Sequence, residues 1–291
     1  MNRRKFTRIL STLGGVTALT GLYAWQIEPF RLEFVRRNMP VSNLPVSLHG
    51  KMLMQISDMH VGIVDRSYLI QSLKEAQAYQ PDIVAYTGDF ITENRGFEFG
   101  ELKAVLDHAV KGKIATVGIL GNHDYGQGWS EADVGETVTG LASAAGITIL
   151  RNDSVNVEGL QIIGIDDLWG TNYRPDTAMA HYISGRATIV LSHNPDTCDE
   201  PIWRDYKGWI LSGHTHGGQV RPPFLPAPVV PVNNKTYTAG EIDLEDGRTL
   251  YINRALGYKW QLRLNVRPEI TILHYNPANE VYHKILDGVN S

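Results

Sequence analysis

The chain has 291 residues, which is enough for one large α/β domain or two small ones. Its formal net charge of -4 argues against a general nucleic-acid binder, which usually carries a basic face, so we expect no nucleic-acid partner. The single cysteine, Cys198, excludes an internal disulfide framework and a cysteine-rich zinc site. Any bound metal must therefore use histidine and oxygen ligands, and the chain offers 10 histidines.

The N-terminus has the pattern of an export signal. A basic segment, "NRRKFTR" at 2–8, precedes an uncharged stretch over 9–27. The pair Arg3 and Arg4 resembles the twin-arginine signal, whose route carries folded proteins. We expect residues 1–27 to be a signal or signal anchor, and the protein to be periplasmic or anchored to the cytoplasmic membrane. No clean cleavage site is present, so cleavage and retention both stay open.

Beyond the leader, the pattern predicts a connector over 28–50 and one domain over 51–291. Short apolar runs there alternate with stretches of helical spacing. The predicted strands are 51–57, 82–88, 114–120, 160–165, 187–192, 208–213, 249–253 and 268–275. The predicted helices are 66–80, 98–111, 131–145 and 175–184. This alternation predicts an α/β domain built on largely buried sheets.

Five of the predicted strands end in residues able to bind a metal or a phosphate. These residues are Asp58 and His60 in "SDMH", Asp89 in "TGDF", Asn122, His123 and Asp124 in "GNHD", His193 in "SHNPD", and His214 and His216 in "SGHTH". Each group alone has an ordinary explanation as a turn. Ligands of open α/β sheets bind at the carboxyl ends of the strands, so this common placement predicts a single site.

The donor atoms of these groups indicate the metal chemistry. A mixed nitrogen and oxygen set without thiolate suits Mn, Fe or Zn better than a structural zinc site or copper. There are too many donors for one ion, but about the right number for two divalent metal ions that share a carboxylate. Paired ions of this kind serve displacement at phosphorus.

In chain order, the motifs D-x-H, G-D, G-N-H-D, a lone histidine after a strand and G-H-x-H resemble those of the calcineurin-like metallophosphoesterases. The resemblance covers about residues 51 to 275. The leader, "DDLW", "SHNPD" and "GHTHGGQVR" are further similar to an exported or membrane-associated bacterial phosphodiesterase branch. The resemblance implies a four-layer α/β/β/α sandwich of two packed mixed β-sheets, with metals at the strand ends.

The resemblance also implies a role for each polar residue. The implied ligands are Asp58, His60 and His216 for the first metal, Asn122, His193 and His214 for the second, and Asp89 as the bridge. His123 is similar to the histidine that contacts the substrate phosphate and assists the leaving oxygen. Asp124 either orients a histidine or completes the turn, and both interpretations stay open.

The implied reaction is hydrolysis of a phosphodiester or pyrophosphate small molecule by metal-activated hydroxide at the cell envelope. Protein Ser/Thr phosphatases of this superfamily carry an Asp-Arg pair that "GDFITEN" lacks, which disfavours that class. The alternatives are a UDP-2,3-diacylglucosamine-type pyrophosphate hydrolase of lipid A synthesis, a phosphomonoesterase, and a non-enzymatic metal-binding scaffold. An exported enzyme would lie on the wrong side of the membrane for a cytoplasmic UDP-lipid.

Two further sets of residues bear on the substrate. A lipid-linked substrate is compatible with the apolar residues Trp129, Trp169, Trp203 and Trp260, although tryptophans are more often core residues. The C-terminal cations are Arg254, Lys259, Arg263 and Arg267. Among these we expect Arg263 to bind a substrate phosphate, the alternative being a set of solvated surface cations. Cys198 is expected to be a buried small side chain.

Overall fold

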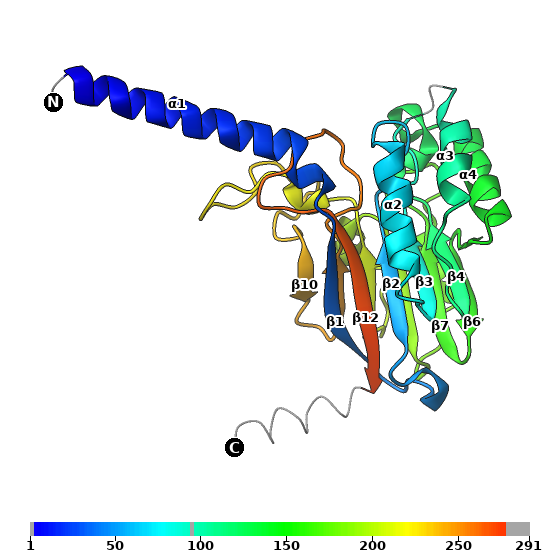
Figure 1. The fold of residues 1–291 in the computed structure, drawn as a ribbon. Coiled ribbons are helices and arrows are strands. Elements are labelled where there is room, and N and C mark those ends of the chain that lie inside the picture. The colour runs from blue at the N-terminus through cyan, green and yellow to red at the C-terminus, as the bar shows by residue number, and fades with distance from the viewer. Residues whose placement is uncertain (1–2, 94–95, 278–291) are drawn as a thin grey trace, which may run out of the picture.

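The computed structural model describes residues 3–93 and 96–277 (Figure 1). Its strands form two six-stranded sheets. In spatial order the first sheet contains β1 (Glu33–Val41), β12 (Glu269–Pro277), β2 (Met52–Ile56), β3 (Ile83–Thr87), β4 (Ala115–Ile119) and β5 (Thr148–Ile149). The second contains β10 (Gly240–Asp243), β11 (Thr249–Ile252), β9 (Trp209–Ser212), β8 (Thr188–Ser192), β7 (Leu160–Ile165) and β6 (Asp153–Val157).

Both sheets are mixed, and both have a parallel centre. Strands β2 to β5 run parallel in the first sheet, as do β7, β8, β9 and β11 in the second. Strand β12 pairs antiparallel with β2, while β6 and β10 pair antiparallel with β7 and β11. The carboxyl ends of β2, β3, β4, β8 and β9 are followed by the five predicted polar groups.

Side chains between the two sheets form an inner core. Leu53, Val117 and other residues of the first sheet pack there against Ile162, Leu191 and Leu211 of the second. Helices α2 (Arg66–Gln77), α3 (Glu98–Leu106) and α4 (Ala132–Ala144) cover the outer face of the first sheet. Helix α5 (Pro175–Ala180) and short 3-10 turns cover the outer face of the second. The predicted four-layer α/β/β/α sandwich is thereby confirmed.

Helix α2 shows how local sequence determines one of these layers. The Asp65 carboxylate accepts a hydrogen bond from the backbone N–H of Tyr68 and caps the first turn. Leu69, Leu73 and Ala76 then recur at helical spacing and are fully buried against the sheet. These residues lie within the helix that the sequence predicted over 66–80.

The connector predicted over 28–50 is wrong in part. Residues 33–41 form β1, an edge strand that pairs in parallel with β12 from Glu33 opposite Glu269 to Val41 opposite Pro277. The strand lacks an apolar alternation because Arg36 and other side chains at its centre are exposed, as suits an edge strand. The sheet that carries the site therefore begins before residue 51.

Helix α1 (Arg3–Gln26) projects from the body, and its last turn is hydrogen-bonded to the loop that follows β11 (Figure 1). The carbonyl oxygen of Ala24 accepts from the backbone N–H of Arg263 at 2.8 Å, and that of Trp25 accepts from Gln261 Nε2 at 3.1 Å. Across residues 3–93 and 96–277, no helix combines the length and the apolarity needed to cross a membrane.

Candidate metal centre

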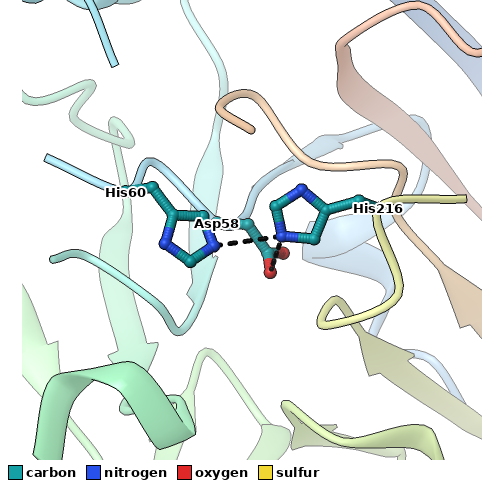
Figure 2. A group of neighbouring side chains, drawn as sticks. All are labelled: Asp58, His60 and His216. Carbon is teal, nitrogen blue, oxygen red and sulfur yellow. Dashed lines mark hydrogen bonds and ion pairs between the residues drawn. The ribbon is translucent and has the colours of Figure 1, made fainter. Parts of the chain in front are cut away.

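Asp58, His60 and His216 converge on one point at the strand ends (Figure 2). Nε2 of His216 lies 3.0 Å from Nε2 of His60 and 3.3 Å from Oδ1 of Asp58. All three side chains are buried. Three lone-pair-bearing atoms held this close away from water are a site for a cation.

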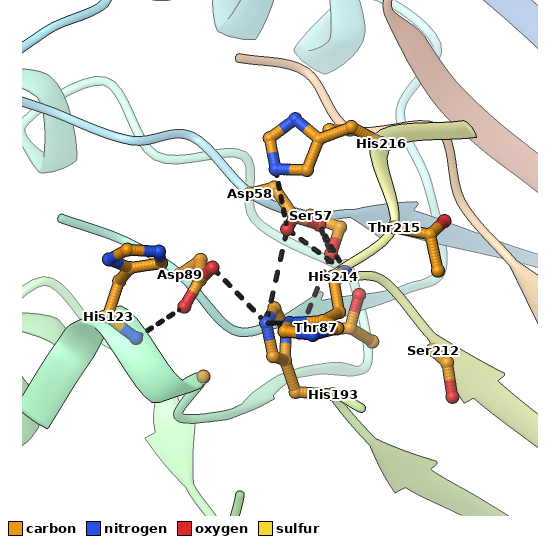
Figure 3. A network of polar contacts seen from close by, with 12 residues as sticks. Ser57, Asp58, Thr87, Asp89, His123, His193, Ser212, His214, Thr215 and His216 are labelled. Carbon is orange, nitrogen blue, oxygen red and sulfur yellow. Dashed lines mark hydrogen bonds and ion pairs between the residues drawn. The ribbon is translucent and has the colours of Figure 1, made fainter. Parts of the chain in front are cut away.

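A second convergent group consists of Asp89, His193 and His214 (Figure 3). Nε2 of His193 lies 3.2 Å from Oδ2 of Asp89 and 3.3 Å from Nδ1 of His214. Asn122 lines the cleft into which this group opens. Its buried side-chain oxygen and nitrogen have no hydrogen-bond partner among the described residues. Buried polar atoms require a partner, and a metal ion would supply one to the Asn122 side chain.

Asp89 stands between the two groups. Its Oδ2 lies 3.2 Å from Nε2 of His193 and 3.5 Å from Nε2 of His60, so one carboxylate reaches both clusters. Asp58 also approaches the second cluster, with Oδ1 at 4.0 Å from Nε2 of His193. This arrangement fits a carboxylate that bridges two divalent cations.

Outer hydrogen bonds orient the imidazoles for metal binding. The contacts are His60 Nδ1 to Thr92 Oγ1 at 3.2 Å, His193 Nδ1 to Thr87 O at 2.7 Å, and His214 Nε2 to Pro231 O at 2.9 Å. A carbonyl oxygen only accepts, so the ring nitrogen facing it carries the proton. The other nitrogen then directs its lone pair into the cluster. The sequence analysis did not identify these three outer partners.

The backbone of the ligand loops is strained. Five non-glycine ligands have positive φ values between 48° and 69°: Asp58, His60, Asp89, His214 and His216. Each such conformation costs roughly 1 kcal/mol or more and persists where the surrounding fold holds it. Gly88, with φ of 91°, is required beside them, because a Cβ there would lie 2.7 Å from Nδ1 of His193.

Both carboxylates of the centre are ionised. Burial acts against the charged form of Asp58, but the nearby His216 and His193 outweigh it and hold the pKa at about 2. The same opposition of burial and neighbouring histidines keeps the pKa of Asp89 well below its ordinary value. The site thus presents two negative charges to a cation.

The imidazoles differ from one another in protonation. Burial lowers the pKa of His60 well below its usual value, and burial together with His193 lowers the pKa of His214 to about 3. For His193, burial is outweighed by the neighbouring Asp89, which raises the pKa well above normal. His60 and His214 are therefore neutral ligands, whereas a cation must displace a proton from His193.

His123 lies beside the second cluster at the start of a short 3-10 turn, Asn122–Tyr125. Its backbone N–H donates to Oδ1 of Asp89 at 2.9 Å, and its Nδ1–H donates to the carbonyl oxygen of Thr92 at 2.7 Å. Burial lowers the pKa of the ring, with Asp89 acting in the opposite direction.

The two clusters open into a cleft of about 500 Å³. Trp129 and Trp169 form one wall, with ring centroids 4.9 Å apart and planes inclined by 15°, and the rings of Trp169 and His214 make an edge-to-face contact with centroids 4.6 Å apart. Trp260 and Lys259 also line the cleft. The fourth tryptophan, Trp203, is instead buried in the outer core of the second sheet.

Comparison with known proteins agrees with this geometry. Residues 52–218 match the family model of the calcineurin-like phosphoesterases, a range that contains all seven implied ligands. The chain belongs to the calcineurin-like phosphoesterase family. It is thus a metallophosphoesterase, a hydrolase of phosphoric ester bonds whose two ligand groups suit the dinuclear metal dependence of that family.

Three relatives are similar to this phosphoesterase over nearly their whole length. The uncharacterized metallophosphoesterase YkuE of Bacillus subtilis is 29% identical, over 96% of this chain and 99% of the relative. Phosphodiesterase YaeI of Escherichia coli is 29% identical, over 94% and 98%. UDP-2,3-diacylglucosamine pyrophosphatase LpxG of Chlamydia trachomatis is 28% identical, over 93% and 98%.

Asp124 of this phosphoesterase completes the turn that carries Asn122 and His123. It is fully buried, with Oδ1 accepting from the backbone N–H of Ile91 at 3.1 Å and Oδ2 from that of Gly121 at 2.9 Å. These bonds fix the turn to the segment after β3. Of the two interpretations left open by the sequence, the hydrogen bonds favour the turn.

The expectation that Arg263 binds a substrate phosphate is wrong. The side chain is fully buried, does not line the cleft, and donates to the carbonyl oxygens of Val266, Arg254 and Gly257. These carbonyls replace water around the guanidinium, so a charged group is tolerated in the interior. Of the four C-terminal cations considered, Lys259 is the one that reaches the cleft.

Proposed function

We propose that this phosphoesterase hydrolyses a phosphodiester or a pyrophosphate at the cell envelope. Its substrate would be a small molecule with an apolar portion. The observation that carries the proposal is the composition of the cleft. Among its described lining residues, Lys259 is the single lysine or arginine, while Trp129, Trp169 and Trp260 supply a large apolar surface. A monoester dianion calls for more cationic contacts than this, whereas a diester carries less charge.

Two of the relatives have names of this reaction class, a phosphodiesterase and a UDP-2,3-diacylglucosamine pyrophosphatase. The second name favours a nucleotide-linked lipid as an alternative substrate, because the apolar wall of the cleft suits acyl chains. Export acts against it, since a UDP-lipid is a cytoplasmic compound. A phosphomonoesterase is the further alternative, and a non-enzymatic scaffold is the least supported.

For the location, we propose export by a twin-arginine-type route, with the protein periplasmic or held at the cytoplasmic membrane through its N-terminal segment. The support is the pair Arg3 and Arg4 before the uncharged stretch over 9–27. Export in the folded state also suits a site with seven ligands, because the metal is then loaded where its supply is controlled.

Asp58, His60 and His216 would hold one divalent cation, and Asn122, His193 and His214 the other, with Asp89 between them. The metal ions would be Mn, Fe or Zn, since the ligands are imidazole, carboxylate and amide. When bound, they supply polarisation of the phosphoryl oxygens and activation of the attacking water.

His123 would assist departure of the leaving group. The hydrogen bond from Nδ1 to Thr92 O fixes the ring plane, so Nε2 is the atom that meets substrate. Burial keeps the free ring mostly neutral, and an anionic substrate phosphate restores the charged form. The protonated Nε2 then donates to the leaving oxygen as the bond to phosphorus breaks.

A paired assay on the full chain tests the proposal. After chelation, the protein is reloaded with Mn²⁺ or Zn²⁺, and turnover of an aryl phosphodiester is compared with that of the matching aryl monoester. We expect a diester preference that chelator abolishes. A monoester preference would contradict the reaction class, and absence of turnover of either compound by the metal-loaded protein would favour the scaffold.

A further inference from the structure

Two loops beside the cleft present large apolar side chains to solvent, one over residues 219–231 and the other over 257–267. We call Phe224, Leu225, Val229, Trp260 and Leu262 the apolar rim. Phe224 is completely exposed, and Leu225 and Trp260 retain 60% and 68% of their accessible surface. Val229 and Trp260 also line the metal cleft, so the apolar rim is continuous with its mouth. A clustered exposed surface of this kind marks an interaction site.

The two loops of the apolar rim are fastened to one another. The backbone N–H of Arg221 donates to Leu264 O at 2.8 Å, and that of Leu264 donates to Gln219 O at 3.0 Å. The side-chain amide of Gln219 donates to the carbonyl oxygens of Trp260 and Leu262. These hydrogen bonds fix the backbone of both loops, so the apolar side chains are exposed on an ordered surface.

Helix α1 joins the same surface. Its last turn is hydrogen-bonded to the loop that carries Trp260 and Leu262, through Ala24 and Trp25. Figure 1 shows α1 leaving the body at the end where the yellow and orange loops that follow β9 and β11 lie. Leu22 and Trp25 are about half exposed on this part of the helix.

The charged residues within the two loops of the apolar rim, 219–231 and 257–267, are all cations. Residues 222–230, "PPFLPAPVV", contain no charged side chain and follow the exposed Arg221. Arg31, which follows α1, and Arg267, which follows the second loop, are also exposed. A protruding apolar tip with arginines at its base matches an anionic bilayer, whose interior takes the tip and whose headgroups take the cations.

We propose that the apolar rim and the last turns of α1 dock this protein on an anionic phospholipid bilayer. Docking places the mouth of the cleft at the lipid surface, next to Val229 and Trp260. The phosphoryl group of a lipid then reaches the metal clusters while the acyl chains of that lipid stay in the bilayer. This last step rests on the proposed function, whereas the docking itself does not. The protruding side chains of Phe224 and Leu225 favour insertion into lipid over a flat contact with a second copy of the chain.

Vesicle binding by the full chain tests the docking. Vesicles of phosphatidylcholine and phosphatidylglycerol in equal parts are sedimented with wild type and with the double variant Phe224→Asp, Leu225→Asp. We expect the variant to lose about tenfold or more in partitioning, because two large side chains no longer enter the bilayer. The matched control is Val46→Asp, Ile183→Asp, which changes two exposed apolar residues elsewhere and retains binding.

Two further readouts keep the outcomes apart. Neither Phe224 nor Leu225 lines the cleft, so turnover of the soluble aryl phosphodiester stays at the wild-type rate in the double variant. If wild type hydrolyses no diester, the proposed function fails while the docking is still decided by sedimentation. If the double variant binds vesicles like wild type, or if wild type binds none, the docking is overturned. A dimer in light scattering that the variant abolishes would assign the apolar rim to a second copy of the chain.

Discussion

The backbone N–H of His123 donates a 2.9 Å hydrogen bond to Oδ1 of Asp89, whose Oδ2 faces both histidine clusters. The residue that would meet the leaving group is thus positioned by the carboxylate that would bridge the two cations. Because the contact uses the main chain of His123, replacing the imidazole leaves it in place. The role of the ring can therefore be separated from the integrity of the metal centre.

His123→Ala is expected to lower kcat by about a hundredfold or more, the usual contribution of a general acid. Metal content, measured by elemental analysis, stays at the wild-type level. The loss is smaller for a nitrophenyl leaving group than for an alkyl one, because a stable phenolate needs less protonation. His108→Ala, at an exposed position near the end of α3, is the control. Equal losses for both leaving groups would contradict proton donation.

Asp89→Asn is expected to reduce metal content and to lower kcat by about a hundredfold or more. The amide is neutral, so the site loses one of its two negative charges and the atom shared by both clusters. Elemental analysis after dialysis and the rate at saturating metal measure the two effects. Asp107→Asn, on the exposed face after α3, should change neither. A variant that retains full metal content and rate would exclude the bridging role.

Thr92→Val is expected to weaken metal binding by about tenfold or more, because His60 Nδ1 loses its outer hydrogen-bond partner. Thr92 also accepts from His123 through its carbonyl oxygen, a contact that the substitution keeps. Titration of the chelated protein with Mn²⁺ measures the affinity. Thr92→Ser restores the hydroxyl and should recover it. If serine and valine behave alike, the hydroxyl does not orient His60.

Thr92 illustrates the limit of what the sequence predicts about the site. Asp58, Asp89 and His193 each follow an apolar strand, and parallel strands bring their carboxyl ends to one edge, so their convergence was predictable. A threonine three residues beyond Asp89 has no such signal. Its contact with His60 depends on the path of a loop, which strand periodicity does not determine.

The fold, like the site, was predictable from the sequence only in part. The alternation of apolar runs and helical stripes predicted an α/β domain with largely buried sheets, since strands buried on both faces have continuous apolar sequences. The arrangement as two packed sheets was implied by the family resemblance. Strand β1 was missed because Arg36 and Arg37 lie exposed at the edge of the sheet. Arg263 was misplaced because its carbonyl partners come from turns at 254–257 and at 266. Only the tertiary structure brings those turns together.

Asp167→Asn is expected to stabilise the metal-free protein above pH 7. Burial raises the pKa of Asp167 from 3.8 to about 7, and its Oδ2 has no hydrogen-bond partner among the described residues. The folded state thus binds more protons than the unfolded state between these values, so stability falls as pH rises through this window. The full difference, about three pKa units, corresponds to roughly 4 kcal/mol.

Urea unfolding of the Asp167→Asn protein in chelator, well below and well above pH 7, measures the effect. The variant keeps an oxygen to accept from the backbone N–H of Trp169, a 2.8 Å bond in the wild type. Its advantage over wild type should grow with pH. Asp107→Asn, at an exposed position, is the control. An advantage that shrinks as pH rises would show that the ionised carboxylate has a favourable partner.

Arg263→Met is expected to destabilise the fold by about 2–4 kcal/mol, because buried carbonyl oxygens of Val266, Arg254 and Gly257 lose their donor. Urea unfolding measures the loss, and Arg267→Met, at an exposed position, should lie within about 0.5 kcal/mol of wild type. At low temperature, where the variant is still folded, KM for the aryl diester should be unchanged. A large rise in KM without loss of stability would indicate that Arg263 contacts the substrate after all. Such a contact would require the loop after Gly257 to open in solution.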